Sequence, residues 1–281
     1  MWSKKFKYQR VRLLVQAGAF LVILLNPLVI YYSKCSFVQG WYQSLAIGKL
    51  WFVSPLEGLE SILVSKTVYF PLVIGLLPPV ILALFLGRVF CGWICPINFL
   101  SSLVDRVFKR QGAKDQVVLP LWLIWFSLIG ELMFSMIIGA PLFVFLSPPG
   151  LVGREIMMVV FFHTLALEGI IIVVVLALNL VTKRFFCRYL CPLGALLALL
   201  GVRRRLIVKL EAEKCKGCRR CGAVCPLGLA PQRGQAQGPY CWNCGTCIDV
   251  CPHQALTFFW RSGGENTSLH RGQNDTPPQG E

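Results

Sequence analysis

Four long apolar stretches dominate the first two thirds of the chain, and short segments that carry most of the charges separate them. They cover Leu13 to Tyr32, Thr67 to Gly87, about Val117 to Leu146, and Ile156 to Val181. Each is long enough to cross a bilayer, which takes about 20 helical residues. We therefore predict an integral membrane bundle of four transmembrane helices. Residues 193–202 are apolar but too few to span, so we expect an interfacial helix or a segment buried against the bundle.

Lys and Arg residues are divided unevenly between the two sides of this predicted bundle. The connecting segments hold 16 of them on the side of the N-terminus and 4 on the other side. Basic residues collect in cytoplasmic loops, so we place both termini in the cytoplasm of a multi-pass protein of a bacterial inner membrane. The same rule explains the formal net charge of +15 without nucleic-acid binding, for which the sequence has no recognition motif.

The composition supports a membrane protein and marks a change of domain. Hydrophobic residues make up 56% of the chain and charged residues 15%, whereas soluble domains are about 45–50% apolar and about 25% charged. After Arg205 the chain continues with a strand-like LIVKL, a cysteine-rich block and QALTFFW. The predicted domains are a basic cytoplasmic N-terminus (1–12), a transmembrane domain (13–205), a ferredoxin-like α+β domain (206–260) and a disordered tail (261–281).

Eight of the thirteen cysteines form two copies of one motif near the C-terminus. Residues 215–226 read CKGCRRCGAVCP, and residues 241–252 read CWNCGTCIDVCP. This is the spacing of bacterial ferredoxins, in which three thiolates of one run and the fourth of the other run hold each [4Fe–4S] cluster. Three cysteines in a tight loop can each reach a different iron, while the fourth points to the partner cluster.

We therefore predict two [4Fe–4S] clusters with crossed ligands. The first is held by Cys215, Cys218, Cys221 and Cys251, and the second by Cys241, Cys244, Cys247 and Cys225. Structural zinc sites are one alternative, but they use four ligands in two CxxC pairs and do not need the terminal proline. Disulfides are the other alternative, and they are rare in the cytoplasm.

A second duplicated cysteine motif, CxxxCP, follows the second and the fourth apolar stretch. Residues 88–100 read RVFCGWICPINFL and residues 184–196 read RFFCRYLCPLGAL, a displacement of 96 residues. Because each copy leaves the membrane on the same side, the repeat implies two parallel two-helix units about an axis along the membrane normal.

The CxxxCP motif places two cysteines four residues apart, which on a helix is one face. Brought together by the repeat axis, two such pairs would offer four thiolates at the cytoplasmic edge of the membrane. That arrangement suits a metal or a redox-active thiol centre. The alternative is that small, soft cysteines pack well between helices. The duplication favours the functional centre, whose members are Cys91, Cys95, Cys187 and Cys191.

Three ionisable residues interrupt the third and fourth apolar stretches. Glu131 and Glu168 lie near the middle of their predicted spans, and His163 lies nearer the outer end of the fourth. Ionisable groups in hydrocarbon are costly and are therefore functional candidates. We expect them to be the catalytic residues of a site that accepts two protons from quinol. The alternatives are an interhelical pair that satisfies itself, or a solvated histidine at the interface.

Together, the spans, the CxxxCP repeat and the C-terminal two-cluster module resemble the NapH-type membrane ferredoxins of periplasmic nitrate reductase systems. The resemblance covers about residues 10–260. It is carried by the segments FCGWICPIN (90–98), SPPGLVGRE (147–155), CPLGALLALLG (191–201), CIDVCP (247–252), GWYQS (40–44) and SPLEGLES (54–61).

This resemblance implies an iron–sulfur electron-transfer protein, the membrane subunit of a quinol dehydrogenase. Such a protein oxidises quinol and passes electrons, with a periplasmic multi-cluster iron–sulfur protein, towards nitrate reductase. Relatives with the same plan serve nitrous oxide reductase, methylamine oxidation and copper-oxidase assembly. The charge pattern places the module in the cytoplasm, however, while the terminal enzyme is periplasmic. The alternative function is therefore a cytoplasm-facing redox maturation or metal-reducing factor.

Overall fold

The computed structural model describes residues 7–33, 38–40, 44–47, 50–108, 118–164, 167 and 169–261. Glu168, one of the predicted proton-accepting residues, lies outside the described residues, as does the predicted disordered tail beyond Arg261. The described chain is mostly helical and contains two small antiparallel sheets.

The helical part extends from the N-terminus through the second CxxxCP motif. Its α-helices are α1 (Lys7–Ser33), α2 (Pro55–Ser65), α3 (Phe70–Leu86), α4 (Val89–Trp93), α5 (Pro96–Val107), α6 (Leu123–Ile138), α7 (Leu142–Leu146), α8 (Pro148–Met157), α9 (Gly169–Val181) and α10 (Pro192–Leu200). Two π-helical segments are η1 (Met158–Phe162) and η2 (Phe186–Leu190). A sheet in the order β1-β2-β3 precedes α2, with strands β1 (Val38–Gly40), β2 (Ser44–Ile47) and β3 (Leu50–Val53).

The C-terminal module follows at Leu206 and is built on two antiparallel strands. These are β4 (Leu206–Leu210) and β5 (Leu256–Trp260), with Leu206 opposite Trp260 and Leu210 opposite Leu256. Each cysteine run contains one short helix, α11 (Arg220–Ala223) or α12 (Thr246–Asp249). The strand expected in LIVKL is confirmed, and the QALTFFW segment contains the second strand.

One helix in the described part of the chain is long and apolar enough to cross a membrane by length and composition, namely α1 over Lys7–Tyr32. The other strongly apolar helices are α3, α6, α9 and α10 with the turn that follows it, and each has 10–17 residues. Residues 192–198 of α10 are buried, which confirms the prediction that this segment packs against the bundle.

The third and fourth predicted spans are not single helices. α6 ends because Gly139 is left-handed (φ 74°) and Pro141, shortly after it, cannot donate the amide hydrogen bond of a continuing helix. In the fourth span, η1 stops before His163, which is left-handed (φ 54°), and the next described helix, α9, begins at Gly169. Histidine adopts this conformation more readily than most side chains. The expectation of one continuous helix over Ile156–Val181 is therefore wrong.

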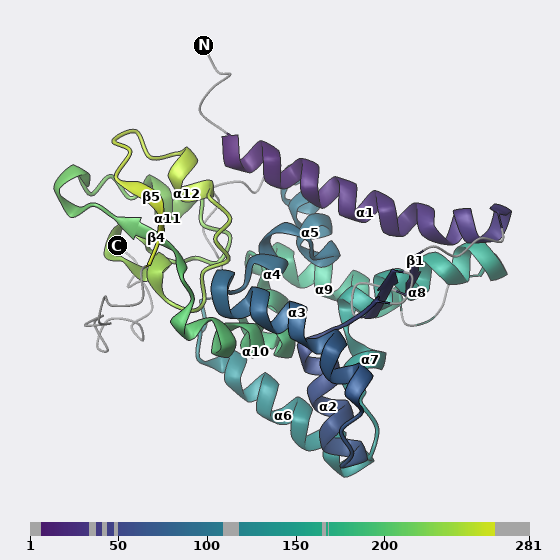
Figure 1. The fold of residues 1–281 in the computed structure, drawn as a ribbon. Coiled ribbons are helices and arrows are strands. Elements are labelled where there is room, and N and C mark those ends of the chain that lie inside the picture. Colours follow the sequence, from purple (N-terminus) through teal and green to yellow (C-terminus); the bar gives the residue numbers. More distant parts are fainter. Residues whose placement is uncertain are drawn as a thin grey trace.

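α1 lies along one side of the molecule, and its first turn reaches the C-terminal module (Figure 1). The amides of Tyr8 and Gln9 donate to the carboxylate of Asp249 in α12, at 3.2 Å and 2.8 Å. A negative side chain at this position satisfies free amides and the positive end of the helix dipole. The ring of Tyr8 also packs edge-on against Phe258, with centroids 5.1 Å apart. Asp249 thus fastens α1 to the module.

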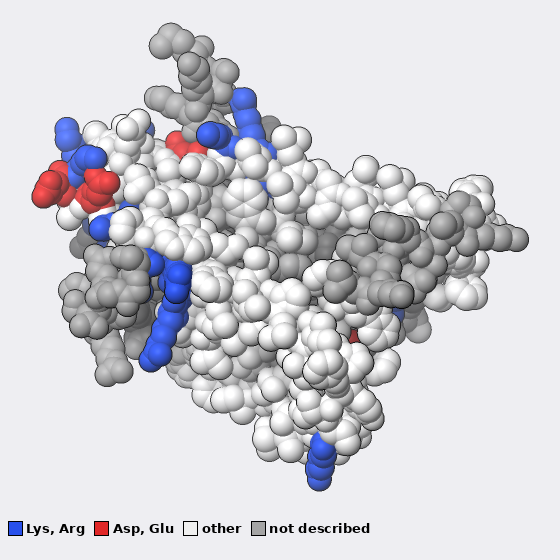
Figure 2. Space-filling view, viewed as in Figure 1, with Lys and Arg blue, Asp and Glu red and all other residues white. Residues whose placement is uncertain are grey.

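Charge is distributed unevenly over the surface. Figure 2 shows Lys, Arg, Asp and Glu gathered mainly at the end occupied by the C-terminal module, while the adjoining helical face is almost free of charge. The helices expose large apolar side chains, among them Leu14 (71%), Phe70 (76%) and Ile137 (75%). Exposed apolar surface of this extent marks contact with a membrane or with another protein.

Candidate functional site

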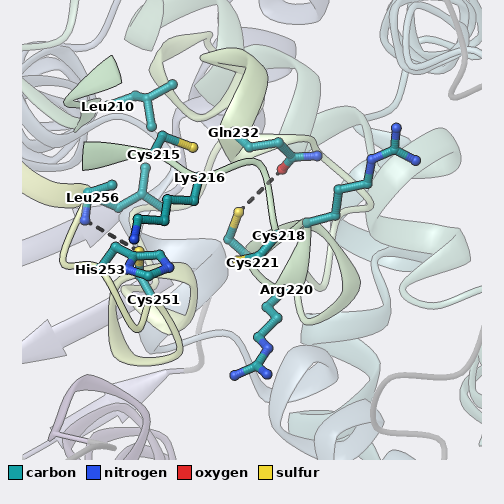
Figure 3. Close-up of a pocket in the computed structure, with 12 residues that line it drawn as sticks. Leu210, Cys215, Lys216, Cys218, Arg220, Cys221, Gln232, Cys251, His253 and Leu256 are labelled. Carbon is teal, nitrogen blue, oxygen red and sulfur yellow. Dashed lines mark hydrogen bonds between the residues drawn. The ribbon is translucent and has the colours of Figure 1, made fainter. Parts of the chain in front are cut away.

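Four cysteines line each of two small cavities in the C-terminal module. The first cavity, drawn in Figure 3, is bounded by Cys215, Cys218, Cys221 and Cys251, and the second by Cys225, Cys241, Cys244 and Cys247. Each cavity thus takes three cysteines from one run and the fourth from the other, which is the grouping that the crossed-ligand prediction uses. That these sulfurs bind iron stays a prediction.

The two cysteine loops share their backbone conformation. The residue before the second cysteine of each run, Gly217 or Asn243, is left-handed, and so is the residue after it, Arg219 or Gly245 (φ between 53° and 73°). In each copy only one of these positions is glycine, so Arg219 and Asn243 adopt a conformation that side chains usually avoid. The same turn, made twice, brings three thiols of each run to one cavity.

The donor set of these cavities fits iron–sulfur clusters. Amide groups donate to two of the sulfurs, from Ala255 to Cys251 Sγ at 3.3 Å and from Asn243 to Cys241 Sγ at 3.4 Å. Burial raises the pKa of Cys225 to about 12, so this thiol is neutral unless a metal replaces its proton. Bound [4Fe–4S] clusters would supply one-electron redox chemistry, with amide hydrogen bonds to sulfur helping to set their potentials.

Within the described ranges, no three His, Cys, Asp or Glu side chains converge as the ligands of one metal ion do. In a [4Fe–4S] cluster, by contrast, each thiolate binds a different iron at a different corner of the cube.

The CxxxCP pairs differ from the expected geometry. Cys91 lies in α4, but Cys95 is extended (ψ 125°) and begins a new helix, α5. Cys187 and Cys191 repeat the arrangement, with η2 before the break and α10 after it. A proline disfavours helical conformation at the residue before it, and proline follows the second cysteine of both pairs. The expectation of two cysteines on one face of a single helix is therefore wrong.

The four CxxxCP thiols nevertheless lie together. All are buried, between 7% and 8% exposed. Burial, followed by repulsion from Cys187, Cys91 and Cys191, raises the pKa of Cys95 well above its usual value. Burial also raises the pKa of Cys187 to about 11, with Arg184 opposing and Cys91 adding to the shift. The fold therefore brings both copies of the motif to one buried centre, which we call the CxxxCP centre.

Two buried arginines, one from each repeat, form hydrogen bonds to the opposite repeat. Arg88 and Arg184 begin the two copies of the motif and are 1% and 4% exposed. Arg88 donates to the carbonyl oxygen of Cys187 at 3.2 Å. Arg184 donates to Asn98 Oδ1 at 2.8 Å, and Asn98 in turn donates to the carbonyl oxygen of Cys91 at 2.9 Å. Each arginine thus supports the cysteine segment of the other repeat.

In the sequence, these arginines stood out only as charges that orient the bundle. The signal that identifies them is their register, because both stand three residues before the first cysteine of a motif. A basic residue that only lies in a solvated loop would not be expected at the same distance from the first cysteine in both copies of the motif.

The CxxxCP centre packs directly against the second cysteine run. Trp93 Nε1 donates to the carbonyl oxygen of Asn243 at 3.1 Å. Gly92 lies so close to Trp242 that an added Cβ would be 3.1 Å from its side chain. Arg204, which is 1% exposed, donates to the carbonyl oxygen of Cys241 at 2.6 Å. No soluble linker separates the two sets of cysteines at this point.

Two of the three predicted quinol residues are described, and they lie on elements that pack against different helices. Glu131 is on α6, which packs against α2, α7 and α10. His163 is exposed at the end of η1, which packs against α1 and α8. On α2, Glu60 is a carboxyl group whose pKa is raised by burial and further by repulsion from Glu131. Glu60 lies in the SPLEGLES segment and was not among the residues predicted for the site.

Comparison with protein families assigns the cysteine-containing segments. A family model described as "4Fe-4S binding domain" matches residues 68–111 and again residues 162–209. Each match contains one CxxxCP pair. A second model with the same description matches residues 240–257, which hold the second ferredoxin run. No solved structure matches the chain.

Several curated proteins are similar over much of the chain. The chain is 26% identical to "Ferredoxin-type protein NapH" of Escherichia coli (strain K12), over 94% of both proteins. It is 30% identical to YccM of the same organism, provisionally named an electron transport protein, over 72% of this chain and 63% of YccM. It is 29% identical to "Methylamine utilization ferredoxin-type protein MauN" of Methylorubrum extorquens, over 80% of this chain and 76% of that protein.

Proposed function

This chain belongs to the family of NapH-type ferredoxin-type proteins, which makes it an electron transport protein with 4Fe–4S binding domains, and from that premise we propose that it oxidises quinol in a bacterial inner membrane. Its electrons pass to a periplasmic multi-cluster iron–sulfur partner and on towards periplasmic nitrate reductase. The observation that carries the proposal is the direct packing of the buried CxxxCP centre on the loop of Cys241.

Four crossings of the membrane are part of the proposal. α1 has the full length for one crossing, and α3, α6 and α9 are apolar with exposed apolar faces. Shorter helices can cross where the bilayer thins or where neighbouring segments complete the span. The concentration of charge at the module supports cytoplasmic termini. A reporter that works only in the cytoplasm should be active when fused after Glu213 and inactive when fused at Gly150.

The chain's own residues position the redox groups in this scheme. The eight ferredoxin cysteines would hold two [4Fe–4S] clusters, and the CxxxCP cysteines would form a redox-active thiol centre beside the second one. Arg88, Arg184 and Arg204 place positive charge around these sites. Glu131, with Glu168 and His163 as further candidates, would accept the protons of the quinol.

A second function is favoured by one observation. The first cysteine set is the more exposed of the two and lies at the charged end of the molecule, which is the cytoplasmic end in the proposed topology. That position suits exchange of electrons with a cytoplasmic donor, as in a redox maturation or metal-reducing factor.

The test is reduction of the clusters by quinol. The purified protein, reconstituted in lipid under anaerobic conditions, is mixed with a reduced quinone, and cluster absorbance is followed with and without the candidate periplasmic partner. Full reduction by dithionite provides the control for cluster content. We expect quinol to reduce the clusters, and the partner to reoxidise them. Reduction by a soluble cytoplasmic donor but not by quinol would select the second function.

A further inference from the structure

Glu60 is a fully buried carboxyl group in α2, between the first two predicted spans (0% exposed). Its Oε2 accepts a hydrogen bond from the amide of Phe143 at 3.2 Å. Its Oε1 has no partner among the described residues. A buried carboxylate with one neutral donor is costly. Burial raises the pKa of Glu60 to about 7, so both protonation states are populated near neutral pH.

Two more carboxyl groups act on Glu60. Glu57 precedes it by one turn of α2, Glu131 comes from α6, and both raise the pKa of Glu60 further by repulsion. Each has a buried oxygen without a partner in the described structure, Glu57 Oε2 and Glu131 Oε1. α2 packs against α3, α6, α7 and α10. Glu131 is the one titratable side chain that these four helices contain, and Glu57 is the other one that faces Glu60.

An independent observation extends this cluster beyond the acidic residues. Ser54, which precedes α2 and is 8% exposed, makes no capping bond, and its hydroxyl has no partner in the described chain. Ser54, Glu57 and Glu60 are spaced three residues apart, so they follow one side of the helix. Glu57 and Glu131 are partly exposed as residues, whereas Glu60 is buried. Each of these four side chains thus has a buried oxygen without a partner in the described chain, on one side of α2 for Ser54, Glu57 and Glu60 and on the adjoining helix α6 for Glu131.

We propose that Glu131, Glu60 and Glu57 form a proton relay that carries the protons released by quinol to the outer side of the membrane. The inference rests on the proposed function. Quinol oxidation breaks two O–H bonds and yields quinone, two protons and two electrons. The electrons pass to the iron–sulfur module, and the protons pass one at a time from Glu131 to Glu60 and on to Glu57. Glu131 is the member that meets the quinol, while Glu60 acts through it.

The test compares Glu60→Gln with Glu155→Gln in the full-length, cluster-loaded protein. Glutamine keeps the shape of Glu60 and still accepts from Phe143, but it cannot carry a proton as a carboxyl group does. Glu155 is a half-buried glutamate of α8 that lies against Gly169 rather than against α2. Positioned proton transfer typically contributes 10²–10⁴-fold to a rate, so we expect Glu60→Gln to slow quinol-driven cluster reduction about 10²-fold. Reduction by dithionite should be unchanged, and Glu155→Gln should behave as the unsubstituted protein.

Two further readouts separate a relay from a structural role. Glu60 must be ionised to accept a proton, so the rate of the unsubstituted protein should rise with pH through about 7, and this rise should disappear in Glu60→Gln. The infrared C=O band of a neutral carboxylic acid should titrate over the same range and be lost in that variant.

Normal quinol-driven reduction with an unchanged pH profile in Glu60→Gln would overturn the relay and leave the proposed function standing. Absence of quinol-driven reduction in the unsubstituted protein, with normal reduction by dithionite, would overturn the proposed function and the relay with it.

Discussion

The two ferredoxin cysteine sets differ in their surroundings, although their sequences have the same spacing. In the first set Cys218 is exposed and Cys215 and Cys251 are half-buried, whereas in the second Cys241, Cys244 and Cys247 are buried. The second set lies under the helical part, in contact with the segments of the CxxxCP centre. Motifs of the same spacing thus have different surroundings, with the first set more open to solvent and the second packed against the helical part.

The largest effect is expected at the CxxxCP centre. If the path to the second set runs through it, Cys91→Ser or Cys187→Ser should reduce quinol-driven turnover to background while both clusters stay spectroscopically intact. Serine has nearly the volume of cysteine and removes the soft thiolate. Turnover normalised to cluster content is the measurement, with Cys35→Ser, outside both motifs, as the control.

If these cysteines only pack, serine should cost about 1–3 kcal/mol of stability for an imperfectly satisfied hydroxyl. Near-normal turnover per folded molecule in both variants would then contradict a path through the centre.

The next largest effect concerns the crossed ligands, which define the two sets. Cys251→Ala should lower the iron content from about eight to about four atoms per chain, because each cubane holds four. The lost signal should be that of the exposed cluster held with Cys215, Cys218 and Cys221. Cys225→Ala is the matched variant and should remove the buried cluster instead. Electron paramagnetic resonance distinguishes them, and loss of the buried cluster in Cys251→Ala would refute the crossed grouping.

A smaller effect is expected at Arg204, which makes the electrostatic surroundings of the two cysteine sets different. Its guanidinium donates to the carbonyl oxygen of Cys241 at 2.6 Å and so places positive charge beside the second set only. Positive charge favours the reduced cluster, so Arg204→Gln should lower the reduction potential of the buried cluster, by tens of millivolts in order of magnitude for one partly screened charge. Redox titration checks this, with the exposed Arg205→Gln as control. Equal shifts of both clusters would argue against a local effect.

The smallest effect is expected where α1 meets the module. Asp249→Asn removes the negative charge that accepts from the amides of Tyr8 and Gln9. Loss of such a terminal interaction typically costs about 1 kcal/mol. Hydrogen exchange of the first turn of α1 should accelerate, while both clusters and the exchange of β4 and β5 stay unchanged. Unaltered exchange at Tyr8 and Gln9 would show that other contacts hold α1.

The sequence by itself determined the features that depend on local spacing. The loops of residues 215–226 and 241–252 are so short that few backbone conformations can connect their cysteines, which made the grouping of thiols and the flanking strands predictable. The 96-residue repeat was visible for the same reason, because it is a property of register. The apolar stretches also located the helices, but not their interruptions at Gly139 and His163.

Only the tertiary structure decided which distant residues meet. The proline after Cys95 and Cys191 turns the chain, and packing of the two repeats then determines that Arg88 reaches Cys187 and Arg184 reaches Asn98. The fold also packs the helix of Glu131 against α2, so that its carboxyl group acts on Glu60. Contacts of this kind depend on how whole helices pack. Hydrophobic periodicity does not determine which helices pack together, because one apolar face can pack against many different apolar faces.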